Sequence, residues 1–176
     1  KHFICRDCSY THYDRIPAES IAFRGTFAVG DHKSVLRYPR QIGYPYFSYK
    51  IYPLSEVRTD LHLLARNIDT QSISPCNDAP TGAKINRGEF AIYHMPHEIS
   101  GMFSVDVTAD EDTEILLMFD EIMRDGKRLD YRRFGATGAL LWRLPAGSHS
   151  LESFEPYSAS YTGFYVLRGS VTVNNM

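Results

Sequence analysis

The last third of the chain consists of short apolar or alternating runs that are separated by turn residues. Turn signals stand at Asp125-Gly126 and at Pro145-Ala146-Gly147. Aspartate, proline and glycine at adjacent positions favour tight turns, and apolar runs of this length between such turns are typical of β-strands. No helix of useful length fits between them, so this region is predicted to form sheet.

Apolar and polar residues also alternate earlier in the chain. Phe103, Val105 and Val107 share one face of 101–108, as expected for a strand with one side toward water. Residues 115–119 are apolar on both faces, which predicts a strand in the middle of the stack. Further strands are expected at 21–29, 88–94, 129–134, 139–144, 149–154 and 161–173, with Gly25 as a bulge or close-approach point and an interruption at Gly169. Short strands at spacings of roughly 8 to 12 residues predict an all-β fold, an antiparallel two-sheet β-sandwich of jelly-roll type.

Four segments have weaker patterns. Residues 57–65 fit both an alternating strand and a helical face, and we favour the strand. Residues 73–82 contain two prolines, Asn77, Asp78 and Gly82 and are predicted to be a loop. The run YPYFSYKIY at 44–52 suits an edge strand because proline cannot donate to a ladder. Residues 1–20 have no sustained period. We expect an irregular N-terminal arm over 1–20 and a β-sandwich over 21–176.

Size and charge limit the classes of function. A chain of 176 residues is expected to be one domain, and its net charge of -2 with a pI near 6.4 gives no basic field for nucleic acid. The longest apolar run, 115–119, is far shorter than the roughly 20 residues of a membrane-spanning helix. Because the chain begins at Lys1 without a basic-then-apolar leader, we expect that an export signal was removed or was never present.

Three phrases in the second half of the chain resemble a known family. They are FDEI (119–122), LPAG (144–147) and FEPY (154–157), and the resemblance is clearest from Gly88 onward. The chain resembles the non-catalytic β-sandwich that precedes the helical catalytic domain of bacterial α-L-rhamnosidases and related six-hairpin glycoside hydrolases. The resemblance implies a fragment of a glycoside hydrolase that is not itself catalytic, has the catalytic domain of the same polypeptide as its partner, and lies in the periplasm or outside the cell.

Glycosidases work with two carboxylates across the scissile bond, and several carboxylates lie near these phrases. The candidates are Asp120, Glu121, Glu152 and Glu155. Adjacent strand residues point to opposite faces, so Asp120 and Glu121 are not expected to line one pocket. We predict no catalytic residue, and a structural polar network of Glu121 and Glu155 with backbone amides or with Arg124, Arg132 and Arg133.

No metal or cofactor is predicted. The residues His2, Cys5, Cys8 and His12 have spacings that could close a zinc site, but the CxxC half is short and chain termini are mobile, so we expect no zinc. Three cysteines leave at least one free thiol, and a disulfide within the pair or with Cys76 stays open beside unpaired thiols.

Other catalytic signatures are absent from the sequence. Pro96 prevents His94, His97 and Glu98 from forming a metalloprotease helix. Neither a phosphate loop nor a nucleophile elbow is present.

Aromatic residues are the candidates for carbohydrate binding. Tyr44, Tyr46 and Tyr52 could stack on a sugar while Arg37 and Arg40 bond its hydroxyls, although strand aromatics are more often core or interdomain contacts, and alternation could equally bury Trp142. An accessory module that docks on a catalytic domain is our first hypothesis. Its docking patch would combine YPYFSYKIY and the FEPYSASY corner with a rim of Arg132, Arg133 and Arg143. An independent module that binds rhamnose-containing or other plant glycans is the alternative, and a free-standing enzyme is the third reading.

Overall fold

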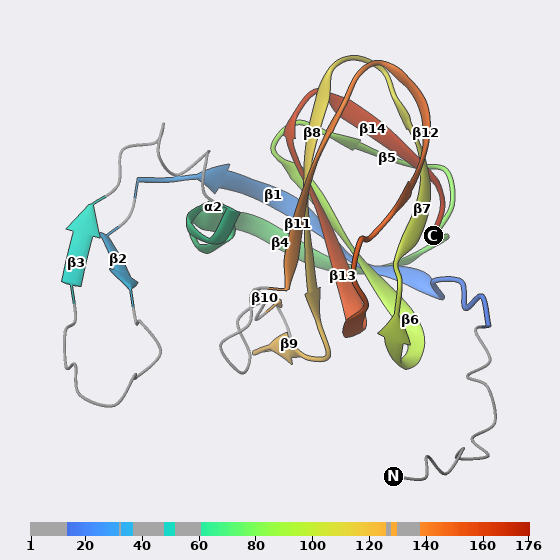
Figure 1. Ribbon diagram of the computed structural model, residues 1–176, viewed down its shortest axis with the longest axis horizontal. Coiled ribbons are helices and arrows are strands. Elements are labelled where there is room, and N and C mark those ends of the chain that lie inside the picture. Colours follow the sequence, from blue (N-terminus) through green and yellow to red (C-terminus); the bar gives the residue numbers. More distant parts are fainter. Residues whose placement is uncertain (1–13, 32, 37–47, 52–60, 126–127, 130–137) are drawn as a thin grey trace, which may run out of the picture.

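The computed structural model describes residues 14–31, 33–36, 48–51, 61–125, 128–129 and 138–176. Strands dominate this part of the chain and form two packed antiparallel sheets (Figure 1). The larger sheet has the order β11-β8-β13-β6-β1-β4 and the smaller one the order β12-β7-β14-β5. The predicted all-β, antiparallel two-sheet sandwich is confirmed, and its jelly-roll type stays a prediction.

The bounds of the elements follow the sheets. The larger sheet contains β1 (Ser20–Val29), β4 (Ile68–Asp78), β6 (Glu89–Gly101), β8 (Thr113–Asp120), β11 (Ala139–Leu144) and β13 (Tyr157–Arg168). The smaller sheet contains β5 (Ala83–Asn86), β7 (Ser104–Ala109), β12 (Gly147–Glu152) and β14 (Ser170–Asn175). Two short ribbons, β2 (Lys33–Leu36) with β3 (Ser48–Ile51) and β9 (Met123–Arg124) with β10 (Arg128–Leu129), and one helix, α2 (Leu61–Arg66), complete the described elements.

The chain crosses between the two sheets through tight turns at the upper end of Figure 1. One crossing is the single residue Gly169 between β13 and β14, where the backbone has φ of +74°. A Cβ at this position would also lie 2.9 Å from the carbonyl oxygen of Asp112. Both constraints require glycine, so the predicted interruption at Gly169 is confirmed.

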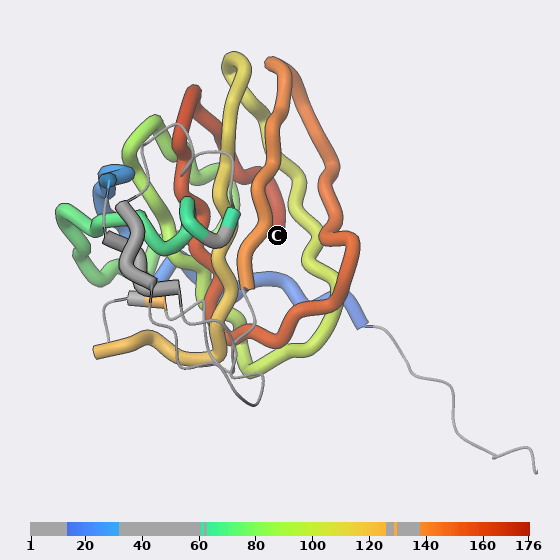
Figure 2. Tube along the Cα trace, turned by 60° about the vertical axis from the view of Figure 1, so that its left-hand side comes forward, coloured from blue at the N-terminus to red at the C-terminus, as the bar shows by residue number. Residues whose placement is uncertain are grey.

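Figure 2 shows the two sheets as two layers. A core of apolar side chains fills the space between them. Residues of alternate parity along each strand reach it, as the pleat requires. Its largest fully buried members are Tyr93 and Phe164, whose rings meet edge-on at 5.1 Å between centroids. Val107 and Val171 contribute from the smaller sheet.

The larger sheet has a second apolar cluster on its outer face. Leu116 and Met118 point into this cluster, whereas Ile115, Leu117 and Phe119 point into the core between the sheets. The prediction that 115–119 is apolar on both faces because it lies inside a stack is therefore confirmed. The helix α2 contributes Leu64 and Ala65 to the outer cluster.

Gly25 is a close-approach point, as the sequence indicated. A Cβ at Gly25 would lie 2.6 Å from a ring carbon of Phe90 and in contact with the carbonyl oxygen of Ser72. The missing side chain lets β1 pass between β4 and the ring of Phe90 on β6.

The strand predicted over 57–65 is wrong for the part that the structure describes. Leu61–Arg66 is helical because the period of Leu61, Leu64 and Ala65 matches a single face that the outer cluster buries. Asn67 ends the helix, since its side-chain amide donates to the carbonyl of Leu63 at 2.8 Å.

The loop predicted over 73–82 is also wrong over most of its length, because β4 continues to Asp78. The strand tolerates Pro75 since it lies at the edge of the sheet and pairs only with β1, opposite Phe23. Only residues 79–82 turn the chain.

Two buried threonines of the larger sheet offer a matched test of polar burial. Among the described residues, the hydroxyls of Thr162 and Tyr93 are buried without a hydrogen-bond partner, and burial raises the pKa of Tyr93. Thr113 is equally buried, but its hydroxyl lies 2.8 Å from the carbonyl oxygen of Glu111 and 3.1 Å from that of Ser170.

We predict opposite effects of the same substitution at these threonines. Thr162→Val should raise the free energy of unfolding by about 1 kcal/mol because it removes an unpaired buried hydroxyl. Thr113→Val should lower it by about 1 to 2 kcal/mol because it leaves two carbonyls without that donor. Urea unfolding midpoints of the two variants measure the difference, and a loss of stability in both would contradict the assignment of Thr162.

Candidate functional site

The two phrases FDEI and FEPY, far apart in sequence, meet at the lower end of the sandwich. Phe119 of the first and Tyr157 of the second stack with 4.6 Å between ring centroids and an interplanar angle of 13°. Phe103 lies beside both rings, 4.4 Å from Phe119. The LPAG phrase connects β11 and β12 at the opposite end. FDEI and FEPY therefore lie together at one end of the sandwich, and LPAG lies at the other end.

The loop before β13 is held to the loop before β7 by one buried serine. The hydroxyl of Ser153 accepts the backbone N–H of Phe103 at 3.0 Å and donates to the carbonyl of Glu155 at 2.8 Å. The backbone N–H of Ser153 donates to the carbonyl of Phe103 at 2.8 Å. These bonds fix both loops relative to the aromatic stack.

Asp120 ends β8 and shapes the turn after it. Its carboxylate accepts the backbone N–H groups of Glu121 at 2.7 Å and Ile122 at 3.3 Å. The side chain is buried, so these bonds stabilise a turn rather than present a carboxylate to substrate.

Glu155 is exposed, and its carboxylate accepts the hydroxyl of Tyr157 at 2.8 Å. Burial, and then the hydrogen bond to and the charge of Glu155, raise the pKa of Tyr157 above its ordinary value. Glu121 is half-buried at the start of the turn after β8. The structure places Glu121 and Glu155 on neighbouring loops of the same end.

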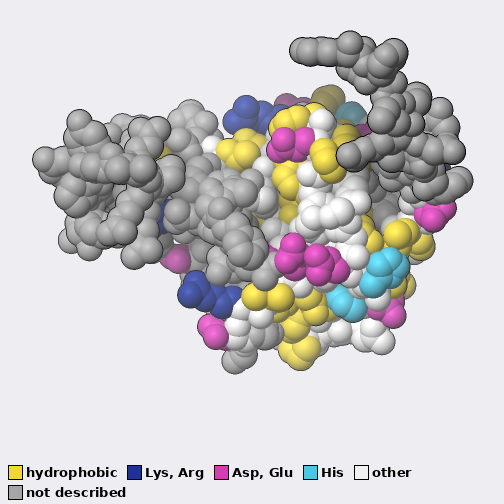
Figure 3. All heavy atoms as spheres, turned by 60° about the horizontal axis from the view of Figure 1, so that its bottom comes forward, with side chains coloured by type: hydrophobic (Ala, Val, Ile, Leu, Met, Phe, Trp, Pro, Cys, Tyr) yellow, Lys and Arg dark blue, Asp and Glu magenta, His cyan; other side chains and the backbone are white. Residues whose placement is uncertain are grey.

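Three large hydrophobic side chains are exposed in the described part of the chain, and all three belong to these loops. The exposed fractions are 44% for Met102, 49% for Ile122 and 79% for Phe154. We call the loops 101–103, 120–122 and 153–157 the docking end. Figure 3 shows the molecule from below, with hydrophobic side chains and carboxylates both at the surface. The docking end thus has a rigid aromatic base and an apolar outer layer.

No catalytic pair of carboxylates is formed by Asp120 and Glu152. Asp120 lies on the same face of β8 as Met118, which is the outer face of the larger sheet. Glu152 lies on the same face of β12 as Ser150, outside the smaller sheet. The two layers of the sandwich therefore separate these carboxylates.

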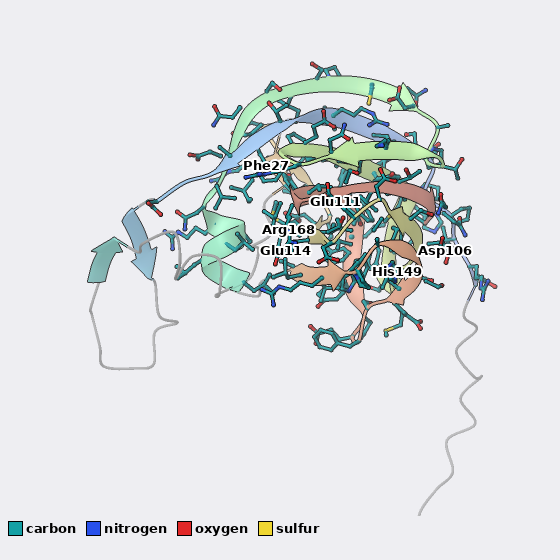
Figure 4. The ribbon with its side chains drawn as sticks, turned by 90° about the horizontal axis from the view of Figure 1, so that it is seen from above. Phe27, Asp106, Glu111, Glu114, His149 and Arg168 are labelled. Carbon is teal, nitrogen blue, oxygen red and sulfur yellow. The ribbon has the colours of Figure 1, made fainter. Side chains whose placement is uncertain are left out.

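The outer face of the smaller sheet is covered by short polar side chains. Ser150 donates to Asp106 at 2.7 Å, and Asn174 donates to Thr108 at 2.9 Å. Asp106 is labelled on β7 in Figure 4. The described strands of this sheet carry no Phe, Tyr or Trp side chain, so they offer none of these rings for a sugar to stack on.

Charge pairs occupy the upper end of the sandwich. Lys84 meets Asp110 at 2.8 Å, and its hydrogen bond, followed by that of Ser170, holds the pKa of Asp110 below its usual value. Arg143 meets Glu114 at 2.9 Å at the start of β8, the opposite end of that strand from the FEPY corner. Arg143 was expected at the rim of a patch around that corner, and the structure does not place it there.

Many of the sequence candidates lie outside the described residues and stay predictions. These are Tyr44, Tyr46, Tyr52, Arg37 and Arg40 for sugar, Arg132 and Arg133 for the polar network, and His2, Cys5, Cys8 and His12 for zinc. Cys76 is described as a free thiol whose Sγ lies 3.2 Å from the carbonyl oxygen of Ile21. In the described ranges, no three His, Cys, Asp or Glu side chains are grouped as metal ligands.

His94 and His97 lie on strand β6, so the helix of a metalloprotease is absent there, as Pro96 indicated. Trp142 is half-buried on β11. Met102 and Ile122 were not predicted from the sequence because neither stands out from its neighbouring residues. The signal that could have found them is their position next to turn residues, after Gly101 and after the carboxylates of FDEI.

No family model matches the chain, and no curated protein matches it in sequence. Its fold is similar to part of a rhamnosidase from Klebsiella oxytoca with rhamnose bound, with a TM-score of 0.50 and 10% identity over 92% of this chain. A GH78 family rhamnosidase of Bacillus sp. GL1 matches 60% of this chain, with a TM-score of 0.47 and 17% identity. The chain spans 28% of the Klebsiella protein and 12% of the Bacillus protein. None of the described helices is long and apolar enough to span a bilayer. The sandwich therefore resembles, in fold, a part of the Klebsiella rhamnosidase.

Substitutions at Tyr157 should separate its ring from its hydroxyl. We expect Tyr157→Phe to change the free energy of unfolding by less than about 1 kcal/mol, because the stack on Phe119 stays and the bond to Glu155 is exposed. Tyr157→Ala should cost about 2 to 3 kcal/mol because the stack and its buried area are lost. Thermal or urea unfolding measures both values, and equal losses would show that the hydroxyl rather than the ring stabilises the docking end.

Proposed function

We propose that this chain is an accessory, non-catalytic β-sandwich of an α-L-rhamnosidase-like glycoside hydrolase. The module would dock on the helical catalytic domain of the same polypeptide. The observation that carries the proposal is the docking end, whose three loops each expose one large apolar side chain, Met102, Ile122 or Phe154. The fold similarity to part of the Klebsiella rhamnosidase supports the enzyme class.

Exposure of this kind is unfavourable for an isolated module in water. Burying a large apolar side chain stabilises by about 1.5 to 3 kcal/mol, so three such side chains on one end favour contact with another surface. A contiguous apolar patch with polar groups around it is typical of an interface between domains or proteins. Glu121 and Glu155 are the polar groups at this end.

The docking end also has the rigidity of an interface. The stack of Phe119 on Tyr157 and the hydrogen bonds of Ser153 hold its loops in one arrangement. Preorganised loops lose little conformational entropy on association, which favours docking. The proposal includes a periplasmic or extracellular location, because that location is expected for the resembled class of enzyme.

The isolated chain should have no glycosidase activity, because Asp120 and Glu152 form no pair across a bond. Asp120 is buried in its turn, and Glu152 lies on the far side of the sandwich. Turnover of aryl α-L-rhamnoside and related aryl glycosides by the purified chain measures this. Turnover that disappears in Glu121→Gln or Glu155→Gln would show instead that the chain is an enzyme.

The chain should bind rhamnose or its oligosaccharides no better than about millimolar, near -4 kcal/mol. The reason is that the described strands of the smaller sheet carry no Phe, Tyr or Trp, and the docking end is suited to protein. Titration calorimetry with rhamnose-containing oligosaccharides decides between the docking module and an independent carbohydrate-binding module. Micromolar binding that is abolished by Tyr44→Ala or Tyr46→Ala would favour the binding module.

A further inference from the structure

The five methionines of the chain lie in very different environments. Met95 is 2% exposed in the core between the sheets, and Met118 is 3% exposed in the outer cluster. Met176 and Met123 are half-buried, and each packs against one of these two clusters. Met102 is 44% exposed. Its thioether is therefore the one that water and small solutes reach most easily.

The residue that follows Met102 holds it at the surface. The backbone N–H of Phe103 donates to the hydroxyl of Ser153, and its carbonyl accepts the backbone N–H of the same serine. The ring of Phe103 is buried in the core, with 4.4 Å between its centroid and that of Phe119. With its neighbour bonded and buried in this way, Met102 presents its side chain to solvent beside the aromatic stack.

An exposed thioether reacts with peroxides. A lone pair of the sulfur forms a bond to one peroxide oxygen while the O–O bond breaks. The departing hydroxide takes the proton of the transferred hydroxyl and leaves as water, so the thioether is oxidised to a sulfoxide and the peroxide is reduced. The product is polar and chiral, and methionine sulfoxide reductases convert it back to the thioether. Oxidation of this kind disrupts interfaces that use methionine as an apolar contact.

We propose that Met102 is a reversible modification site, at which a peroxide oxidises the sulfur and thereby weakens the docking end as an apolar contact surface. The inference rests on the proposed docking function. Met102 is one of the three large hydrophobic side chains that the docking end exposes, so its sulfoxide introduces a strong hydrogen-bond acceptor that an apolar partner surface leaves unpaired. The coupling is reciprocal, because a partner that covers Met102 also slows its oxidation.

Oxidation at Met102 changes the surface without changing the fold. The sulfoxide oxygen of an exposed side chain is hydrated by water, and the stack of Phe119 on Tyr157 stays in place beneath it. Oxidation of Met95 or Met118 would instead place a polar group in an apolar cluster, which is strongly unfavourable. Burial therefore protects the fold, and exposure confines the modification to the docking end.

Hydrogen peroxide and peptide mass spectrometry test the selectivity. In the unchanged chain, Met102 should gain an oxygen atom at least about threefold faster than each of the other four methionines, because susceptibility follows exposure. The urea unfolding midpoint should stay the same once Met102 alone is oxidised. Equally fast oxidation of Met123 or Met176 would overturn the proposal, and so would a fall of the midpoint that accompanies oxidation of Met102.

Retention on a phenyl column at high salt tests the effect on the surface, with Met102→Leu and Met123→Leu as a matched pair that keeps an apolar side chain of similar volume. Peroxide should shorten the retention of the unchanged chain and of Met123→Leu, and leave that of Met102→Leu the same. An equal shift in both variants, or no shift in the unchanged chain, would overturn the proposal.

Phe154→Ser separates this inference from the function on which it rests. It should shorten retention without peroxide, because it removes the most exposed large hydrophobic side chain of the docking end. If Phe154→Ser shortens retention and oxidation does not, the docking end remains an apolar surface and only the role of Met102 is wrong. If neither shortens it, the docking end is no apolar contact surface, and the proposed function fails together with the inference.

Discussion

The strands β6, β8 and β13 of the larger sheet are buried on both faces over most of their central residues, and the rest of the structure depends on this constraint. On β8, Leu116 and Leu117 are neighbours in sequence but lie in different apolar clusters, one outside and one inside the sandwich. A sheet of this kind needs a cover on each side. The smaller sheet covers the inner face, and α2 covers part of the outer face. The outer face of the smaller sheet is then left polar and exposed.

The same strand that joins the two clusters also positions the docking end. Phe119 is the last inward residue of β8, where it stacks on Tyr157, and Asp120 follows at once and forms the turn that exposes Ile122. The position of Ile122 therefore follows from the burial of β8 and the turn at Asp120. A surface that is both apolar and rigid is more consistent with docking than with a mobile lid.

Local pattern was sufficient where one face or both faces of a strand are buried, as in 104–108 and 115–119, although Met102 and Phe103 lie in the connection before the first of these strands. It failed for 57–65, because alternation and helical period both fitted and only the outer cluster, a tertiary feature, selects the helix. It failed for 73–82 because Pro75 reads as a loop signal unless the strand is known to be an edge. The docking end could be predicted only in part. FDEI and FEPY are separated in sequence by several strands, so their contact is not visible in the sequence, and the exposure of a side chain is a property of the fold.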